Sequence, residues 1–266
     1  MTLPSFAYRR AADTDDALDA LALGSVTLLA GGQSLLPKLK SGAGTVDTVL
    51  DIGGLAELSY VVERDGVLAI GAATTHHLLA TSELLARQAP LLHAAAGEIA
   101  DPQVRHRGTI GGSLVNADPA ADLAVAALAA DAEVLLRSRT GERVVGVGTA
   151  PRPDELLVEV RVPVAEGLRW NYQKFHRDAL EWAVVGVAAL ARTDAPRIAL
   201  SGMGPAVLRA HAVERALADG ASAETAAEFA DDGTAPVGDP HASAEFRRHL
   251  ARVLVRRALT EIGVGT

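Results

Sequence analysis

Apolar and polar positions alternate along the chain in a way that predicts helices and strands following one another. From residue 13 onward, leucines and alanines recur at helical spacing, and the apolar run at 26–30 is typical of a buried strand. A second apolar run at 46–52 predicts another strand. Together these elements predict a small first lobe over residues 1–55.

The pattern over residues 56–165 predicts a second lobe in which helices alternate with strands. It begins with a β-hairpin, because two short apolar runs flank the turn pair Asp65-Gly66. The predicted elements are strands at 60–62 and 67–70, helices at 74–85 and 91–99, a helix at 119–129 capped by Asp118, and strands at 132–136 and 156–162. Three prolines between residues 151 and 163 place the end of this lobe near residue 165.

The pattern over residues 166–266 predicts a C-terminal α+β lobe. Strand-like runs at 170–176, 183–191 and 197–203 precede three helical segments. In the last helix, at 242–262, an apolar stripe contains Phe246, Leu250, Val253, Leu254 and Ala258, whereas Arg247, Arg248, Arg252 and Arg256 lie largely outside it. This pattern predicts that the arginines face solvent or a neighbouring subunit.

Composition and charge exclude several classes of protein. With 266 residues, 49% of them hydrophobic and 22% charged, the chain can bury a sizeable core. The net charge of −8 disfavours nucleic acid and anionic membranes as partners. No apolar run reaches the roughly 20 residues of a membrane span. Because the first residues lack the basic start and apolar run of a secretory signal, we expect a cytoplasmic protein.

The chain contains no cysteine, which removes disulfides, thiolate metal sites, catalytic thiols and cysteine-held iron–sulfur clusters. The adjacent His76 and His77 point to different faces of a predicted helix, so we expect them to be structural and no metal site to form. Redox chemistry in this chain therefore requires an organic cofactor.

The first candidate site is a glycine loop at residues 28–35, Leu-Leu-Ala-Gly-Gly-Gln-Ser-Leu, which follows a predicted buried strand. Glycines allow the backbone to approach a ligand closely, so that successive amides can converge on phosphate oxygens, with Ser34 as a further donor. A simple glycine turn that closes the strand is the alternative. A short glycine motif by itself does not decide between them.

The second candidate site lies in residues 107–122 and contains a second glycine loop at 109–113, Thr-Ile-Gly-Gly-Ser. Thr109 and Ser113 can donate to phosphate or ribityl oxygens, and Asp122 suits a pair of sugar hydroxyls. The spacing of neither loop is that of a Rossmann fingerprint or a P-loop. The sequence therefore disfavours a common nucleoside triphosphatase.

Taken together, these motifs resemble the FAD-binding medium subunits of carbon monoxide dehydrogenase and related molybdenum hydroxylases, and the flavin domain of xanthine dehydrogenase. The resemblance covers essentially the whole chain. It rests on Phe-x-Tyr-Arg at 6–9, Ala-Gly-Gly-Gln-Ser-Leu at 30–35, Gly-Ala-Ala-Thr-Thr-His at 71–76, Ala-Asp-Pro-Gln-Val-Arg at 100–105, Thr-Ile-Gly-Gly at 109–112 and Glu-Phe-Arg-Arg-His-Leu-Ala-Arg at 245–252.

The resemblance implies a two-lobed FAD-binding fold of the vanillyl-alcohol-oxidase/PCMH type, followed by a C-terminal α+β domain of the CO dehydrogenase flavoprotein type. It implies that FAD lies between the first two lobes. The residues that it assigns to FAD are Leu28, Leu29, Ala30, Gly31, Gly32, Gln33, Ser34, Leu35, Thr109, Ile110, Gly111, Gly112, Ser113, Asp122, Leu157, Lys174 and Trp182.

Three positions depart from the family pattern. Gln33 stands where histidine is common, Ser113 replaces a common asparagine, and Glu181-Trp182 replaces Asp-Tyr beside the flavin ring. An aromatic side chain at 182 can still stack on the ring. The last departure leaves the electron acceptor open.

The resemblance implies a subunit that takes electrons from iron–sulfur clusters on a small partner chain, with molybdopterin on a large one, and passes them to an external acceptor. In that case no side chain of this chain acts as a catalyst on the organic substrate. One alternative is a free-standing flavoenzyme with its own small-molecule substrate near Trp182. Another is an assembly or ligand-binding module that has lost FAD.

Overall fold

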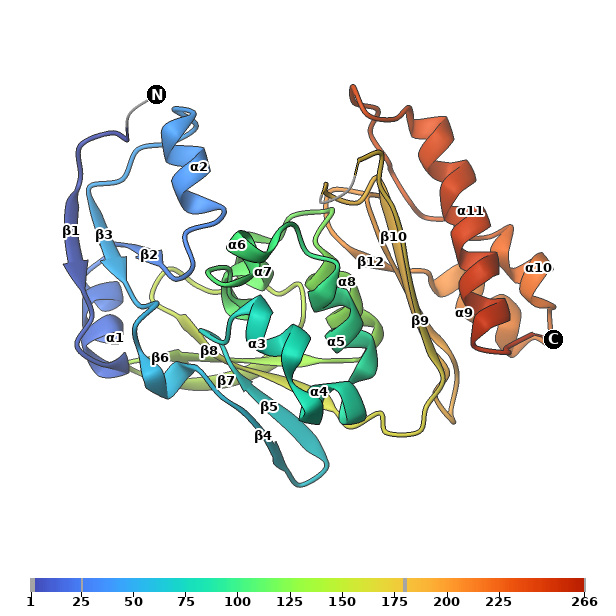
Figure 1. Cartoon of the computed structure of the whole chain (residues 1–266), viewed down its shortest axis with the longest axis horizontal. Helices are drawn as coiled ribbons and strands as arrows, with labels where there is room; N and C mark the ends of the chain where they lie inside the picture. The colour runs from blue at the N-terminus through green and yellow to red at the C-terminus, as the bar shows by residue number, and fades with distance from the viewer. Residues whose placement is uncertain (1–2, 25, 179–180, 266) are drawn as a thin grey trace.

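A computed structural model describes residues 3–24, 26–178 and 181–265. Three separate β-sheets lie in a row, each with its own helices (Figure 1). This arrangement confirms the predicted α+β class. The division of the chain at residues 55 and 165 stays a prediction, which the separate sheets support.

The first sheet is parallel, with the strand order β1-β3-β2. Its elements are β1 (Ala7–Arg10), α1 (Thr14–Ala22), β2 (Thr27–Leu29), α2 (Leu35–Lys40) and β3 (Thr48–Asp51). The side chain of Asp13 caps α1 by accepting from the amide of Asp16. The buried face of α1 shares one apolar core with Leu135, Leu156 and Val158 of the second sheet. The first lobe is therefore anchored on the second.

The second sheet is antiparallel, with the strand order β4-β5-β8-β6-β7. Its strands are β4 (Val61–Arg64), β5 (Val67–Gly71), β6 (Glu133–Ser138), β7 (Gly141–Gly146) and β8 (Leu156–Pro163), and a 3-10 turn, η1 (Ala56–Leu58), precedes them. Its helices are α3 (His76–Thr81), α4 (Glu83–Gln88), α5 (Pro90–Gly97), α6 (Pro102–Arg105), α7 (Ile110–Asn116) and α8 (Asp122–Ala129). The predicted hairpin forms at Asp65-Gly66, and both residues have positive φ, as a two-residue turn requires.

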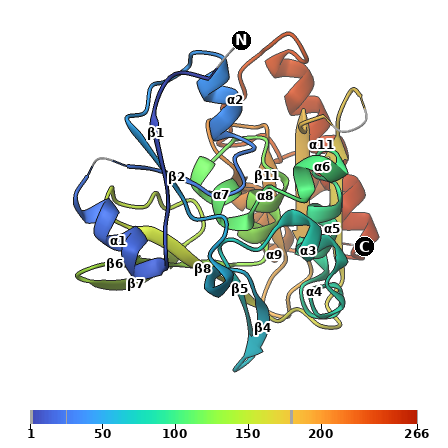
Figure 2. The same ribbon diagram turned by 60° about the vertical axis from the view of Figure 1, so that its left-hand side comes forward.

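The third sheet is antiparallel, with the strand order β12-β11-β10-β9, and lies against the helices of the second lobe (Figure 2). Its elements are β9 (Trp170–Phe175), β10 (Val185–Leu190), β11 (Arg197–Ser201), β12 (Leu208–Arg209), α9 (His211–Ala218), α10 (Ala223–Ala227) and α11 (Ala244–Glu261). Every residue of β10 is buried because both faces are covered. Ala188 and Leu190 pack on the core beneath α5 and α8, and Val187 packs on the core beneath α11.

Two predicted helices have different bounds in the structure. The helix predicted at 74–85 is two helices, because the hydroxyl of Ser82 accepts from the amide of Leu85 and starts α4. The helix predicted at 119–129 begins only at Asp122, because the carboxylate of Asp118 caps a turn by accepting from the amide of Ala120 instead. Strands β1, β7 and β12 and helices α2, α6 and α7 are not among the predicted elements.

The predicted faces of the last helix are wrong at two positions. Phe246 is 42% exposed and packs edge-on against Phe175, with ring centroids 5.9 Å apart. Arg247 is buried, and its guanidinium donates to the carbonyl of Val184 and to the carboxylate of Asp239. A buried arginine is tolerated here because acceptors of two different segments meet it.

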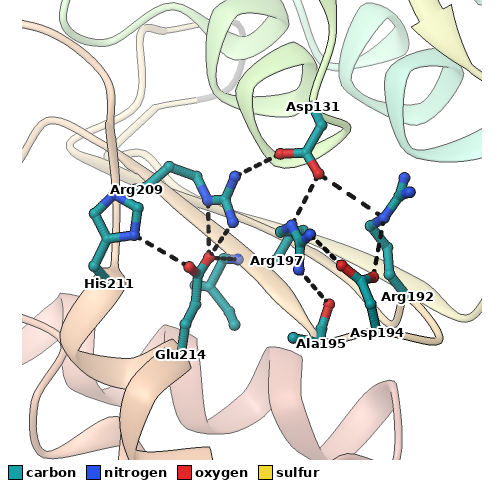
Figure 3. Close-up of polar contacts among 9 residues, drawn as sticks. Asp131, Arg192, Asp194, Ala195, Arg197, Arg209, His211 and Glu214 are labelled. Atoms are coloured by element: carbon teal, nitrogen blue, oxygen red, sulfur yellow. Dashed lines mark hydrogen bonds and ion pairs between the residues drawn. The ribbon is translucent and has the colours of Figure 1, made fainter. Parts of the chain in front are cut away.

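Asp131 holds the C-terminal sheet to the second lobe through a cluster of arginines (Figure 3). Its carboxylate lies 2.8 Å from the guanidinium of Arg197, 2.7 Å from that of Arg209 and 3.8 Å from that of Arg192. Asp131 follows α8 and has a φ of 52°. The three arginines belong to the β10–β12 region, so the cluster joins two lobes.

Asp131→Asn is expected to lower the free energy of unfolding by about 1–2 kcal/mol, because three arginines lose their shared anion in a partly exposed site. Asparagine keeps the size of the side chain and tolerates positive φ. The measurement is urea unfolding of both proteins. The control, Asp194→Asn, removes a carboxylate that pairs with Arg192 and Arg197, both of the C-terminal lobe, and we expect a smaller loss; equal losses would contradict the joining role.

Candidate cofactor site

A cavity of about 700 Å³ opens between the first and second lobes. The first lobe contributes the first glycine loop and Lys38, and the second contributes α7 and the start of α8. Glu181 and Trp182 close the side next to the C-terminal lobe. The two glycine loops, about eighty residues apart in the sequence, therefore line one space.

The first glycine loop presents unused backbone donors to this cavity. Among the described residues, no acceptor receives a hydrogen bond from the amides of residues 31–35, which we call the amide loop. All five residues line the cavity, and Gly32 has a φ of +76°. Consecutive free amides around a left-handed residue form a concave site for an anion. This geometry favours the ligand-binding interpretation over a simple turn.

Gly31 holds the two lobes in close contact. A Cβ atom on Gly31 would collide with the backbone carbonyl of Arg107, and one on Gly112 would lie 4.0 Å from the Cβ atom of Ala30. Only a residue without a side chain permits this approach at position 31. The spacing between the two loops therefore depends on glycine.

The second glycine loop has most of its backbone donors occupied by the fold. The amide of Ile110 donates to the carbonyl of Thr74 at 3.0 Å, and that of Gly111 donates to the carbonyl of Ala72 at 2.9 Å. The amide of Gly112 donates to the hydroxyl of Thr109, which caps α7. The two loops thus differ: the first offers free amides, and the second forms a rigid wall to which Ser113 adds a hydroxyl group.

Asp122 is a buried anion of the cavity wall. Its carboxylate accepts from the hydroxyl of Tyr172 at 2.5 Å and from the ammonium of Lys174 at 3.1 Å. The side chains of Asp122 and Lys174 are each only 4% exposed. Lys174 also donates to the carbonyl of Glu98 at 2.8 Å. The ammonium group of Lys174 therefore binds the carboxylate of Asp122 and a backbone carbonyl.

The pKa values in this group follow from burial. Burial raises the pKa of Asp122, and Lys174 and the Tyr172 hydroxyl oppose that rise. Burial and the neighbouring carboxylate raise the pKa of Tyr172 well above its ordinary value, so its hydroxyl stays a donor. Asp122 thus depends on two neighbours to stay ionised.

The cavity gathers most of the residues that the sequence assigned to it. The predicted residues that line it are Leu28, Leu29, Ala30, Gly31, Gly32, Gln33, Ser34, Leu35, Thr109, Gly111, Gly112, Ser113, Asp122, Leu157 and Trp182. Ile110 is fully buried behind the wall, and Lys174 reaches the wall only through Asp122. Trp182 is 58% exposed. The role of each residue toward a ligand stays a prediction.

Several lining residues were not singled out from the sequence as cofactor contacts. His76 is 6% exposed, its Nδ1 has no partner among the described residues, and burial lowers its pKa to about 4. Glu155 accepts from Arg143 at 2.7 Å, which lowers its pKa to about 2. Lys38 and Arg152 are the lysine and arginine residues of the lining. His76 belongs to the motif at 71–76, but only the structure shows that it lines the cavity.

A second cavity, of about 530 Å³, adjoins the first on the side of the C-terminal lobe. Asp118, Glu181 and Trp182 line both cavities. The second cavity is completed by residues of the C-terminal lobe, among them Gly202, Pro205 and Arg247. Trp182 therefore stands at the junction of two spaces.

Residues 3–24, 26–178 and 181–265 hold no group of three or more histidine, aspartate or glutamate side chains arranged to bind a metal ion. They also hold no helix of the length and hydrophobicity needed to cross a bilayer.

Comparisons with known proteins agree with this geometry. Residues 4–165 match the family model described as FAD binding domain in molybdopterin dehydrogenase, and residues 170–262 match that of the CO dehydrogenase flavoprotein C-terminal domain. The chain is 36% identical to the 6-hydroxypseudooxynicotine dehydrogenase complex subunit alpha of Paenarthrobacter nicotinovorans, over 98% of this chain and 95% of the relative. It is 33% identical to the carbon monoxide dehydrogenase medium chain of Hydrogenophaga pseudoflava, over 97% of both chains.

The structure comparison extends the likeness to the whole fold. A carbon monoxide dehydrogenase chain from Hydrogenophaga pseudoflava, solved without the Mo-pyranopterin moiety, superposes with a TM-score of 0.92. The superposition covers 99% of both chains at 32% identity. The fold predicted from the resemblance is thus confirmed, and the chain belongs to the family of FAD-binding subunits of molybdopterin dehydrogenases.

Proposed function

We propose that this chain holds FAD between its first two lobes and relays electrons from iron–sulfur clusters of a small partner subunit to an external acceptor. The oxidation of an organic substrate belongs, in this proposal, to a large partner subunit that carries molybdopterin. Membership of the family makes the chain part of an FAD-dependent oxidoreductase. The electron path and a cytoplasmic location are predictions.

The amide loop is the observation that carries the proposal. FAD has a pyrophosphate group with two negative charges, and five consecutive unused amides are a suitable donor set for it. A carboxylate, by contrast, repels phosphate and suits sugar hydroxyls, so Asp122 fits the ribityl or ribose part of the cofactor. The donor chemistry of the cavity therefore fits a flavin dinucleotide.

We assign the remaining contacts by their place on the wall. Ser34 and Ser113 offer hydroxyl donors near the two loops, and Gln33 folds its side-chain amide toward the carbonyl of Gly31 at 3.4 Å. Trp182 offers an exposed aromatic face at the mouth, as a flavin ring requires for stacking. When bound, the flavin can accept electrons singly and release them singly or in pairs. The protein residues position it and limit its contact with water.

The division of labour among subunits follows from composition. The chain has no cysteine with which to hold an iron–sulfur cluster, so clusters that feed electrons to its flavin must lie on another chain. Its relatives include a protein named as a dehydrogenase complex subunit alpha and one named as a medium chain. These names support a complex of several chains.

Purification of the tagged chain from its own source tests this proposal. We expect the preparation to be yellow, to release all its flavin on acid precipitation, and to contain copurifying chains with iron, sulfide and molybdenum. A colourless preparation would contradict the cofactor assignment. A yellow chain with no partner, at any ionic strength, would contradict the subunit assignment.

The second cavity favours one alternative. A free-standing flavoenzyme needs room for its own substrate beside the flavin, and the space next to Trp182 and Glu181 provides such room. An external electron acceptor would need the same space. Turnover of an organic substrate by the isolated chain is the result that would favour the alternative.

A further inference from the structure

Lys38 stands out among the charged residues of the cavity. It lies in α2, whose first turn follows the amide loop, and its backbone amide donates to the carbonyl of Ser34 at 3.3 Å. Its ammonium group donates to the side-chain carbonyl of Asn116 at 2.6 Å. Asn116 is the last residue of α7, the helix that begins at the second glycine loop. This hydrogen bond therefore connects the two lobes across the cavity that both residues line.

Carboxylates outnumber cations on the cavity wall, even with Lys38 included. Four carboxylates line the cavity: Asp118, Asp122, Glu155 and Glu181. The lining cations are Lys38 and Arg152, and His76 is neutral near pH 7 because burial holds its pKa at about 4. A dinucleotide adds two more negative charges to this wall. Anionic ligands bind well only where cations or amide donors offset such repulsion.

Two neighbouring cations, Arg152 and Lys174, already have carboxylate partners. Arg152 lies 3.9 Å from Glu155, and Lys174 lies 3.1 Å from Asp122. Lys38 forms no ion pair with the described residues, and its one hydrogen-bond acceptor is a neutral amide. Its charge is thus available to a ligand in the cavity.

We infer that Lys38 is a further binding residue of the cofactor site, and that its ammonium group pairs with the pyrophosphate while Asn116 holds it over the cavity. This inference rests on the proposed FAD site. The flexible stem of lysine allows one ammonium group to donate to both Asn116 and a phosphate oxygen. The amide loop and Lys38 would then both bind the pyrophosphate, and the Lys38–Asn116 hydrogen bond would engage both lobes.

Titration of the apo chain with FAD at several salt concentrations tests the inference, with flavin fluorescence as the signal. We expect Lys38→Met to raise the Kd about tenfold at low salt, as for one charge-assisted bond in an exposed setting. We also expect the Kd of Lys38→Met to depend less on salt than that of the wild type, because one screened ion pair is gone. Lys40→Met, on the same helix but outside the cavity lining, is the matched control and should behave as the wild type.

Asn116→Ala separates the charge of Lys38 from its tether. This variant keeps the cation, so we expect a smaller rise in Kd and a salt dependence like that of the wild type. ADP, which carries a pyrophosphate but no flavin, should lose affinity in Lys38→Met by about the same factor as FAD does. Thermal unfolding of each apo variant reports whether it is folded.

The outcomes distinguish this inference from the proposed function. If Lys38→Met binds FAD with the wild-type Kd and salt dependence, Lys38 is not a binding residue, although the FAD site stands. If Lys38→Met and Lys40→Met weaken binding equally, the effect is one of overall charge and the inference is wrong. If the wild-type chain itself binds no FAD, the proposed function fails first.

Discussion

Gly32→Ala is expected to weaken FAD binding by about 100-fold or more while the chain stays folded. Gly32 has a φ of +76°, and an added Cβ atom would lie 3.0 Å from the side chain of Leu36 and 3.3 Å from that of Leu29. A side chain there drives the backbone out of the left-handed region, so the amides no longer converge on one point. Loss of about two charge-assisted hydrogen bonds, at ~1.5–3 kcal/mol each, accounts for this size.

Gly42→Ala is the matched control for this variant. Gly42 has a φ of +78°, and a Cβ atom there would have no neighbour within 4 Å. Both substitutions therefore strain the backbone to the same extent, and this strain lowers the free energy of unfolding by about 1 kcal/mol in each variant. Only Gly32→Ala alters the amide loop. Flavin titration beside urea unfolding checks the pair, and similar Kd values for the two variants would contradict the role of the loop.

Lys174→Met is expected to lower the free energy of unfolding by about 3 kcal/mol near neutral pH, since it leaves the buried carboxylate of Asp122 without its cation. Methionine occupies a similar volume, so packing is largely kept. The side chains of both partners are 4% exposed, and solvent cannot replace the lost charge. The hydroxyl of Tyr172 would be the remaining side-chain donor to Asp122 among the described residues.

The loss is expected to grow as the pH rises. Burial already raises the pKa of Asp122 in the folded chain above its ordinary value of 3.8, and removal of Lys174 raises that pKa further. Below pH 3.8, this carboxyl group is protonated in both the folded and the unfolded state, so its protonation does not penalise folding. Above 3.8, the unfolded chain releases the proton first, and stability falls until the folded pKa is passed. In Lys174→Met, the pH range over which the free energy of unfolding falls therefore extends to higher pH.

Urea unfolding from pH 4.5 to pH 8 measures this dependence. The difference between the wild type and Lys174→Met should widen across the range. The double variant Asp122→Asn with Lys174→Met lacks the Asp122 carboxyl group, so the additional pH dependence should disappear. A stability difference that stays constant from pH 4.5 to 8 would show that Asp122 does not titrate in response to Lys174.

The sequence predicted those elements whose signals are local. The hairpin at Asp65-Gly66 and the start of the first helix near residue 13 follow from turn chemistry and helical spacing over a few residues. The break at Ser82 was missed because serine caps a helix only when its backbone is extended, as it is here, with a ψ of 114°. Arg247 was placed on the wrong face because helical spacing does not reveal its two acceptors. Val184 lies 63 residues before it in the sequence, and Asp239 lies in the irregular segment that precedes α11.

The candidate site could be predicted only in part for the same reason. The glycine loops were recognisable as motifs, but the free donors of one and the occupied donors of the other depend on tertiary contacts such as Gly111 with Ala72. Lys38 was not found, since its neighbour Asn116 lies 78 residues away. Motifs thus indicate where a ligand binds, and the fold decides which atoms are available to it.

The central claim is that this chain carries a flavin that relays electrons and has no organic substrate of its own. The most direct test is an anaerobic titration of the isolated, FAD-loaded chain with a reductant and with candidate substrates. The absorbance of the flavin is the signal. We expect dithionite to bleach the flavin and an oxidant to restore it. Aldehydes, purines, N-heterocycles and carbon monoxide should leave it oxidised until partner chains are added. Turnover of any of these by the isolated chain, at roughly one per second or faster, would contradict the account.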